Sequence, residues 1–348
     1  MIAFFFYLPF LLIFLLLAVY AERKISAFMQ DRLGPMVVGP YGLLQTLADT
    51  LKMMQKEDIV TKSADKWVFL MAPLVIFVAV FSGFSVLPLT SSIQGSKAET
   101  GVFYMMAVIS LDVIGVLMAG WGSNSKFSLF GALRAVAQIV SYEIPLGLSI
   151  LCVVMMSQSL SLQEISIQQG LLFSEGGYEH GGFLAWNVFR YPALSIAFVI
   201  YFIASLAEAN RSPFDLAESE SELIGGFHTE YSGFRWAIVM LGEYGMMLLV
   251  SLVGAMLFLG SWNTPFPNIG VVKLADWTSG ISGEWSGNVA GGFWLLIKAV
   301  MLVFVQMWVR WTYPRLRIDQ VMSLSWKYLT PIGLVLVLIC GFWKIWLG

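Results

Sequence analysis

The first 24 residues read MIAFFFYLPFLLIFLLLAVYAERK (Met1–Lys24), and the run from Met1 to Ala21 carries no charged side chain. About 20 apolar residues cross roughly 30 Å of hydrocarbon as an α-helix. The segment has neither a basic leader nor a small-residue cleavage site, so we expect it to be retained as the first membrane span.

Similar apolar runs recur along the 348 residues, of which 58% are hydrophobic and only 12% charged. So few charges cannot coat a soluble domain of this length. We therefore expect an all-α polytopic membrane protein, a single transmembrane domain over residues 1–348. The net charge of −2 gives no basic field for nucleic acid. About eight spans are expected, near residues 2–22, 68–90, 102–122, 134–157, 190–209, 235–260, 289–311 and 326–346.

The positions of Lys and Arg predict the orientation of these spans. Most of the basic residues fall in or beside the connections at about 23–66, 210–235 and 311–326. Basic connections stay in the cytoplasm, so these three loops are expected inside and both termini outside a bacterial inner membrane. The opposite connections, such as SSIQGSKAETG (91–101) and GLLFSEGGYEHGG (170–182), are rich in Gly and Ser and are expected to be simple connectors.

The segment after the first span reads AERKISAFMQDRLGPMVVGPYGLLQTLADTLKMMQKED (21–58). Two Gly-Pro pairs, Gly34-Pro35 and Gly39-Pro40, predict defined turns. Leucines then recur at helical spacing, which predicts an amphipathic helix lying in the membrane interface. Two plainer interpretations remain: the helix is a surface anchor only, and the charges of Glu22, Arg23 and Lys24 mark the membrane boundary.

Acidic residues also lie inside the apolar runs. Asp112, Glu143 and Glu243 fall within expected spans, and Glu208 lies at the end of one. A carboxylate in hydrocarbon costs about 2.5–3.5 kcal/mol on insertion scales, so it is expected to face a partner or a water-filled path. Desolvation favours the protonated form, which allows such groups to take up and release protons. We predict a proton path, with structural hydrogen bonding as the alternative.

The stretch EANRSPFDLAESESELIGGFHTEY (Glu208–Tyr231) concentrates acid between two apolar runs, against one arginine, Arg211. Such a cluster is stable only when it is protonated, paired with arginine or well hydrated. A solvated cytoplasmic loop is the alternative interpretation. Its carboxylates are Glu208, Asp215, Glu218, Glu220, Glu222 and Glu230.

A last group of charges follows the seventh span in VRWTYPRLRIDQVM (309–322), where arginines can serve as ordinary membrane anchors. Cys152 and Cys340 sit in apolar runs and are expected to be core thiols. His180 and His228 lie in polar loops, whereas a haem in a helix bundle would need axial ligands within the spans. The sequence therefore supports neither a haem nor a metal site.

These motifs, together with GSNSKFSLFGALRAVAQIVSYEIPLGL (122–148), closely resemble a family of membrane subunits of respiratory complex I, known as the H subunit in bacteria and as subunit 1 in mitochondria. The resemblance runs from about residue 20 to residue 330 in the same motif order. It implies a protein that joins the proton-pumping membrane arm to the hydrophilic arm carrying the iron–sulfur clusters. Its cytoplasmic loops would dock on the hydrophilic quinone-site subunits.

The resemblance also implies a site and a mechanism. Ubiquinone or menaquinone would enter a chamber from the lipid, and the acidic loop and buried acids would couple quinone reduction to proton movement. No haem, flavin, metal or iron–sulfur cluster is expected on this chain. The carboxylates assigned to the coupling path are Asp112, Glu143, Glu208, Asp215, Glu218, Glu220, Glu222, Glu230 and Glu243. The residues assigned to the quinone chamber are Arg23, Arg32, Arg211, Phe214, Arg310 and Arg315.

Two positions depart from the family pattern. The family usually has Asn where this chain has Met36, and often Pro where it has Ala217, so the local geometry of those loops is open. Two other functions also remain open at this point. One is the homologous membrane subunit of an energy-converting hydrogenase, which uses no quinone; the other is a stand-alone ion transporter.

Overall fold

The computed structural model describes residues 2–174, 177–180, 182–216, 225–269, 272–280 and 284–347. Each expected span falls on a helix, and six of these helices are long and apolar enough to cross a membrane, with α8 a shorter apolar helix. The fold class is confirmed as all-α and polytopic. The helices of the eight spans are α1 (Ile2–Met29), α3 (Lys66–Phe84), α4 (Gly101–Gly122), α5 (Lys126–Ser157), α8 (Pro192–Glu208), α10 (Gly233–Phe258), α12 (Trp285–Thr312) and α14 (Thr330–Leu347).

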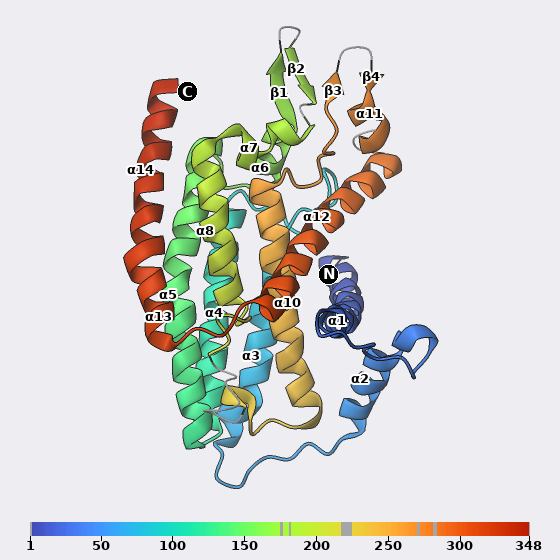
Figure 1. The fold of residues 1–348 in the computed structure, drawn as a ribbon, viewed down its shortest axis with the longest axis vertical. Helices are drawn as coiled ribbons and strands as arrows, with labels where there is room; N and C mark the ends of the chain where they lie inside the picture. The colour runs from blue at the N-terminus through green and yellow to red at the C-terminus, as the bar shows by residue number, and fades with distance from the viewer. Residues whose placement is uncertain are drawn as a thin grey trace.

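The bundle is built around α5 and α10 (Figure 1). Helix α5 packs against α4, α8 and α14, while α10 packs against α3, α8 and α12. Helix α12 crosses the bundle diagonally, and α1 is seen nearly end-on, so both are inclined to the other helices. Each has 28 residues and is about 42 Å long, which exceeds the roughly 30 Å hydrocarbon layer and is accommodated by tilt.

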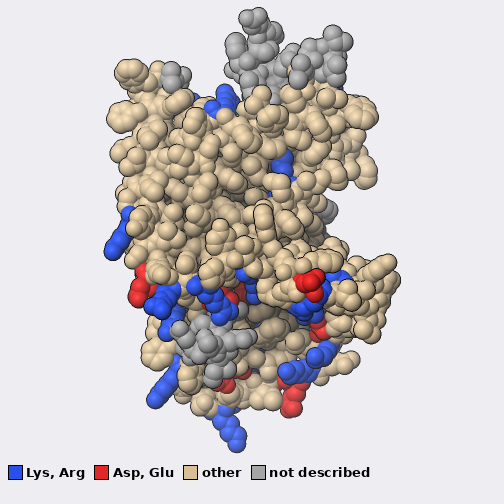
Figure 2. Space-filling model, viewed as in Figure 1, with Lys and Arg blue, Asp and Glu red and all other residues tan. Residues whose placement is uncertain are grey.

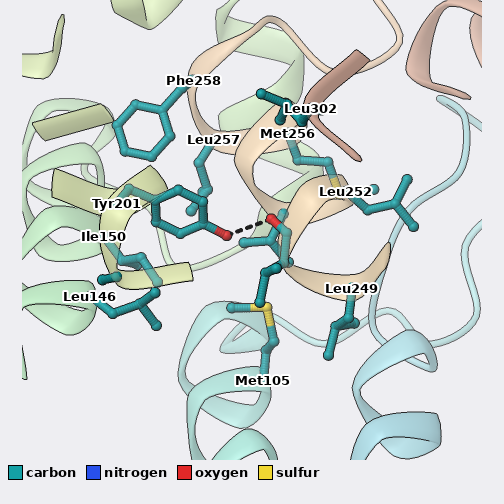
Figure 3. Close-up of a cluster of buried hydrophobic side chains, with 14 of the residues drawn as sticks. Met105, Leu146, Ile150, Tyr201, Leu249, Leu252, Met256, Leu257, Phe258 and Leu302 are labelled. Atoms are coloured by element: carbon teal, nitrogen blue, oxygen red, sulfur yellow. Dashed lines mark hydrogen bonds between the residues drawn. The ribbon is translucent and has the colours of Figure 1, made fainter. Parts of the chain in front are cut away.

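The second half of α10 forms the centre of the core, and every residue from Met246 to Phe258 is buried. The Tyr201 hydroxyl donates to the Val250 carbonyl at 2.7 Å, and apolar side chains of neighbouring helices close around this bond (Figure 3). A Cβ on Gly254 would lie 2.9 Å from the Tyr201 ring, so glycine allows α8 and α10 to approach closely. Small residues commonly permit such contacts between membrane helices.

The two ends of the bundle differ in chemistry. Lys, Arg, Asp and Glu gather over the lower half of the molecule in Figure 2, and we call this the charged end. The other end carries two short antiparallel hairpins and is called the hairpin end (Figure 1). The strands are β1 (Leu171–Ser174) with β2 (Gly177–His180) and β3 (Asn268–Ile269) with β4 (Val272–Lys273).

The structure at the hairpin end differs from the expectation of simple connectors there. The expected connector at 170–182 contains the paired strands β1 and β2, and short helices near it and before α12 pack against the ends of α10 and α12. Their polar side chains satisfy backbone carbonyls that no helix could satisfy by itself, a need that composition does not reveal. These elements are α6 (Leu162–Gln168), η2 (Gly182–Ala185), α7 (Asn187–Arg190) and α11 (Leu274–Ser279).

At the charged end, the turns predicted from the Gly-Pro pairs are confirmed. Gly34 and Gly39 adopt left-handed backbone angles, with φ of 67° and 74°, which glycine reaches without strain. They lead through η1 (Pro40–Gly42) into α2 (Gln45–Gln55), the expected amphipathic helix. Further along the chain, η3 (Gly226–His228) precedes α10, and α13 (Ile318–Ser323) with the π-helical turn η4 (Leu324–Leu329) leads into α14.

Candidate functional site

A cavity of about 480 Å³ lies at the charged end between α1, α2, α10 and α12. Part of its wall is apolar and part is charged. The apolar wall is formed mainly by Leu15, Leu16, Val19, Met53, Trp236 and Met240. The charged and hydroxyl-bearing wall includes Glu22, Arg23, Arg32, Asp49, Lys52, Tyr244 and Arg310.

Glu22 organises the charged wall, although only 5% of its surface is exposed. Its carboxylate accepts a hydrogen bond from the Tyr244 hydroxyl at 2.6 Å and pairs with Arg211 at 3.3 Å. The Arg310 guanidinium pairs with its other oxygen. The Glu22 carboxylate therefore joins four segments, namely helices α1, α10 and α12 and the chain after α8. It faces two positive charges.

Two further arginines lie on the rim of the cavity. Arg23 pairs with Asp49 of α2 at 2.5 Å, and this bond ties the end of α1 to the amphipathic helix. Arg32 donates to the Gln30 side chain at 2.7 Å. Three of the six residues expected in a quinone chamber, Arg23, Arg32 and Arg310, thus line a single cavity.

Arg211 lies behind this wall and is 6% exposed. Burial by itself lowers the pKa of its guanidinium, but the nearby Glu22, Tyr244 and Glu243 side chains raise it, and the net pKa lies above the usual value. The guanidinium also lies over the Tyr244 ring, 4.2 Å from its centroid. Arg211 is therefore a fixed cation that contacts Glu22 and lies within electrostatic range of Glu243.

A second, much smaller cavity of about 10 Å³ lies deeper in the bundle, with room for about one water molecule. Asp112 of α4, Glu208 of α8 and Glu243 of α10 all line it, so three of the predicted acids from three helices come together. Within the described part of the chain, Asp112 Oδ1 and Glu208 Oε2 have no hydrogen-bond partner. We call Asp112, Glu208 and Glu243 the acid pocket.

Glu143 extends the acid pocket toward α5. Its carboxylate accepts a hydrogen bond from the Ser110 hydroxyl on α4, two residues before Asp112. It is also near enough to Glu208 for the two carboxylates to repel each other. Four of the predicted acids therefore form one connected group.

The other predicted residues lie outside both cavities. Asp215 pairs with Arg315 at 3.0 Å, which ties the loop after α8 to the chain between α12 and α13. Phe214 is buried against the Tyr142 ring, with centroids 5.1 Å apart, and does not line the cavity. Glu230 lies between η3 and α10. Three loop acids lie outside the described residues: Glu218, Glu220 and Glu222.

Two residues that the structure places at the centre are absent from the site predicted from the sequence. Glu22 stands directly before Arg23 and Lys24, where it is indistinguishable from part of a membrane-boundary cluster. Tyr244 follows Glu243 directly and is one aromatic residue in a chain that is 15% aromatic. No local pattern marks either residue, because their partners lie 189 to 288 positions away for Glu22 and 222 for Tyr244.

Other ionisable groups at the charged end are held in the packing. His228 lies edge-on to the Phe227 ring at 5.2 Å and close to Trp236 at 6.4 Å. Burial lowers the pKa of His228 to about 4, while Asp215 acts in the opposite direction.

Among the described residues, no group of three His, Cys, Asp or Glu side chains is placed to hold a metal ion.

Comparison with known proteins agrees with this architecture. A family model described as NADH dehydrogenase matches residues 2–341. The NADH-quinone oxidoreductase H subunit 2 of Cytophaga hutchinsonii is 54% identical, with 98% of each chain covered. The H subunit of Chlorobium luteolum is 52% identical over 94% of this chain and 84% of the relative, and that of Bacteroides fragilis is 44% identical over 92% and 84%. The chain belongs to the NADH dehydrogenase family, among the membrane-embedded H subunits of NADH-quinone oxidoreductase, which is respiratory complex I.

Proposed function

We propose that the 480 Å³ cavity admits a quinone from the lipid and that the acid pocket couples its reduction to proton translocation. The observation that carries this proposal is the junction of an apolar wall with the Glu22–Arg310–Tyr244 cluster. In this role the chain is a subunit of a quinone-reducing, proton-translocating NADH dehydrogenase and bears no redox centre of its own.

The cavity suits a quinone in size and chemistry. Ligand pockets commonly enclose about 300–1,000 Å³, with apolar walls and a few polar groups that orient the ligand. An isoprenoid tail would lie against the apolar wall, beside Leu15 and Met240. A quinone ring offers only carbonyl acceptors, and the arginines of the charged wall are donors.

Coupling would depend on the connection between the two cavities. Glu243 and Tyr244 are neighbours on α10, yet Glu243 lines the acid pocket and Tyr244 the quinone cavity. Arg211 contacts Glu22 and interacts electrostatically with Glu243. A change of charge or geometry at Glu22 would therefore alter the field at the acid pocket, where Glu208 and Asp112 could release or accept protons.

The resemblance and the names of the relatives support a place between other complex I subunits. The charged end would face the hydrophilic iron–sulfur and quinone-site subunits in the cytoplasm, and the sides of the bundle would face small membrane-arm subunits and lipid. Cysteines introduced at Ser63, at the charged end, and at Ser96, before α4, should label from opposite faces of sealed bacterial inner-membrane vesicles. Labelling from one face would contradict the span count.

Replacing Arg310 with Met tests the cavity. Arg310→Met removes a guanidinium from Glu22 while keeping an extended apolar side chain. We expect quinone-dependent turnover of the assembled complex to fall at least about tenfold, since one charge-assisted hydrogen bond is worth about 1.5–3 kcal/mol. Electron transfer from NADH to a soluble acceptor at the hydrophilic arm should not change.

The matched control is Arg190→Met, which removes an exposed arginine at the hairpin end. It should leave both activities intact. Equal loss of both activities in Arg310→Met would indicate failed assembly, and normal quinone turnover in an intact complex would refute the assignment of this cavity.

A further inference from the structure

A buried lysine stands apart from both cavities. Lys298 of α12 is 5% exposed, although lysines are rarely buried in proteins. Its ammonium donates to the Ser261 carbonyl at 2.8 Å and to the Asn263 carbonyl at 2.6 Å. It also lies 4.2 Å from the centre of the Trp186 ring. No acidic side chain forms an ion pair with it among the described residues.

The three contacts suit a protonated amine. An ammonium has three N–H donors and no acceptor, whereas a neutral amine presents a lone pair. Two carbonyl oxygens and the face of an indole all attract positive charge, and tryptophan is the best aromatic partner for a cation. The surroundings of Lys298 therefore form a binding site for one primary ammonium group.

This binding site is built on the end of α10. The helix ends at Phe258, and the chain then turns through Gly260 and Ser261, both with positive φ. A Cβ on Gly260 would collide with the Trp186 indole, so glycine is required both for the turn and for the contact. Lys298 binds the carbonyl of Ser261 directly after this turn, where the helix dipole favours a cation.

Polar side chains from two other elements complete the cap. The Gln169 amide donates to the Met256 carbonyl at 2.7 Å and accepts from the Gly260 N–H at 2.9 Å. The Asn187 amide donates to the Leu257 carbonyl at 2.7 Å. The Met256 and Leu257 carbonyls of α10 are thus satisfied from outside the helix, and Lys298 of α12 binds the turn that completes this cap.

Helices α10 and α12 both extend from this cap to the proposed quinone cavity. Tyr244 lies about 21 Å along α10 from Phe258, and Arg310 lies about 18 Å along α12 from Lys298, at 1.5 Å per residue. Between these points, the helices share a hydrogen bond from Gln306 to Ser251 at 3.3 Å. A slip of α10 against α12 at the hairpin end would change how Tyr244 and Arg310 meet Glu22.

We propose that Lys298 is a positioning residue whose ammonium binds the turn after α10 and fixes the register between α10 and α12, which present Tyr244 and Arg310 to Glu22. The effect on quinone turnover rests on the proposed function of the cavity. The cap at the hairpin end is a property of the fold and can be tested separately.

The first experiment compares Lys298→Met with Lys97→Met, an exposed lysine near the same end, in the assembled complex. Hydrogen exchange at the amides of Leu259 and Ser261 should become faster in Lys298→Met only. Quinone-dependent kcat/KM should fall about tenfold to a hundredfold, as expected for a displacement of about 1 Å at a reacting site. NADH oxidation by a soluble acceptor should not change.

Chemical rescue tests the ammonium itself and does not depend on Lys298→Met folding well. In Lys298→Ala, n-propylammonium should slow the exchange at Ser261 and restore quinone turnover, whereas 1-propanol of similar size should do neither. Rescue by both compounds would show that Lys298 only fills space, and rescue by neither would overturn the proposal. Rescue of the exchange rate without rescue of quinone turnover would confirm the cap and refute its link to the cavity.

Discussion

Glu22 and the acid pocket place the same chemical group in two opposite environments. The Glu22 carboxylate receives two guanidinium groups and a tyrosine hydroxyl. Asp112 and Glu208 are equally buried, yet within the described residues neither has a cationic partner and each has an oxygen without a hydrogen bond. A buried charge is tolerated when it is paired, whereas an unpaired carboxylate in a bundle is costly when ionised.

In the proposed function, this difference separates a fixed charge from a proton carrier. Glu22 can remain ionised because its partners compensate it, so it serves as an anchor for four segments of the chain. Glu208 would gain from protonation, so in the proposed function its charge changes during turnover. Arg211 touches the first site and interacts electrostatically with Glu243 in the second, which makes the two environments parts of one system.

The largest effect is expected when the fixed charge is removed. Glu22→Gln keeps the shape of the side chain but leaves Arg211 and Arg310 without their anion. Removing one partner of a buried pair costs about 3–5 kcal/mol. We expect the amount of assembled complex and its thermal midpoint to drop, together with quinone turnover.

Glu22→Asp is the matched control, because it keeps the charge at shorter reach and should be partly tolerated. The measurements are yield of intact complex on native gels and turnover per assembled complex. A fully stable and active Glu22→Gln complex would show that Glu22 does not act as a compensating charge.

The acid pocket should respond in the opposite way. Glu208→Gln preserves shape and hydrogen-bonding capacity but cannot titrate near neutral pH. We expect normal assembly, with proton pumping and coupled quinone reduction reduced severalfold. Glu208→Asp should be milder, since it keeps a titratable group. Normal pumping in both Glu208→Gln and Glu143→Gln complexes would exclude a relay role for these residues.

His228 offers a test of burial at the charged end, because burial outweighs the nearby Asp215 charge in setting its pKa. Its pKa of about 4 lies below the unfolded value of about 6.5, so both states are neutral above pH 6.5. As the pH falls from 6.5 toward 4, the unfolded state takes up a proton first, and up to about 3 kcal/mol of stability is lost. His228→Gln should flatten the fall of the thermal midpoint of the complex between pH 7 and 5. An unchanged pH profile would mean that other groups control acid stability.

The sequence predicted much of this arrangement, because apolar runs, Gly-Pro turns and leucine spacing are local signals. The turns at Gly34 and Gly39 and helix α2 followed from them and are confirmed. Each expected span falls on a helix, and six of these helices are long and apolar enough to cross a membrane. The contacts of Glu22 and Lys298 could not follow, since each depends on partners from distant parts of the chain. The buried acids were found because a carboxylate within an apolar run is unusual by itself, but their convergence on one pocket depends on helix packing.

The smallest effect is expected for an ion pair at the charged end that is more exposed than the Glu22 pairs. Asp58 pairs with Arg235 at 2.9 Å, with side chains 36% and 21% exposed. Exposed ion pairs typically contribute about 0.2–1 kcal/mol, because water already solvates both charges. Asp58→Asn should therefore change the thermal midpoint and quinone turnover very little, and added salt should remove the remaining difference. A loss comparable to that of Glu22→Gln would contradict the rule drawn from Glu22, because pairing would then matter regardless of burial. Such a result would mean that Arg235 has a further structural role. Its guanidinium also lies 5.9 Å from the centre of the Phe69 ring.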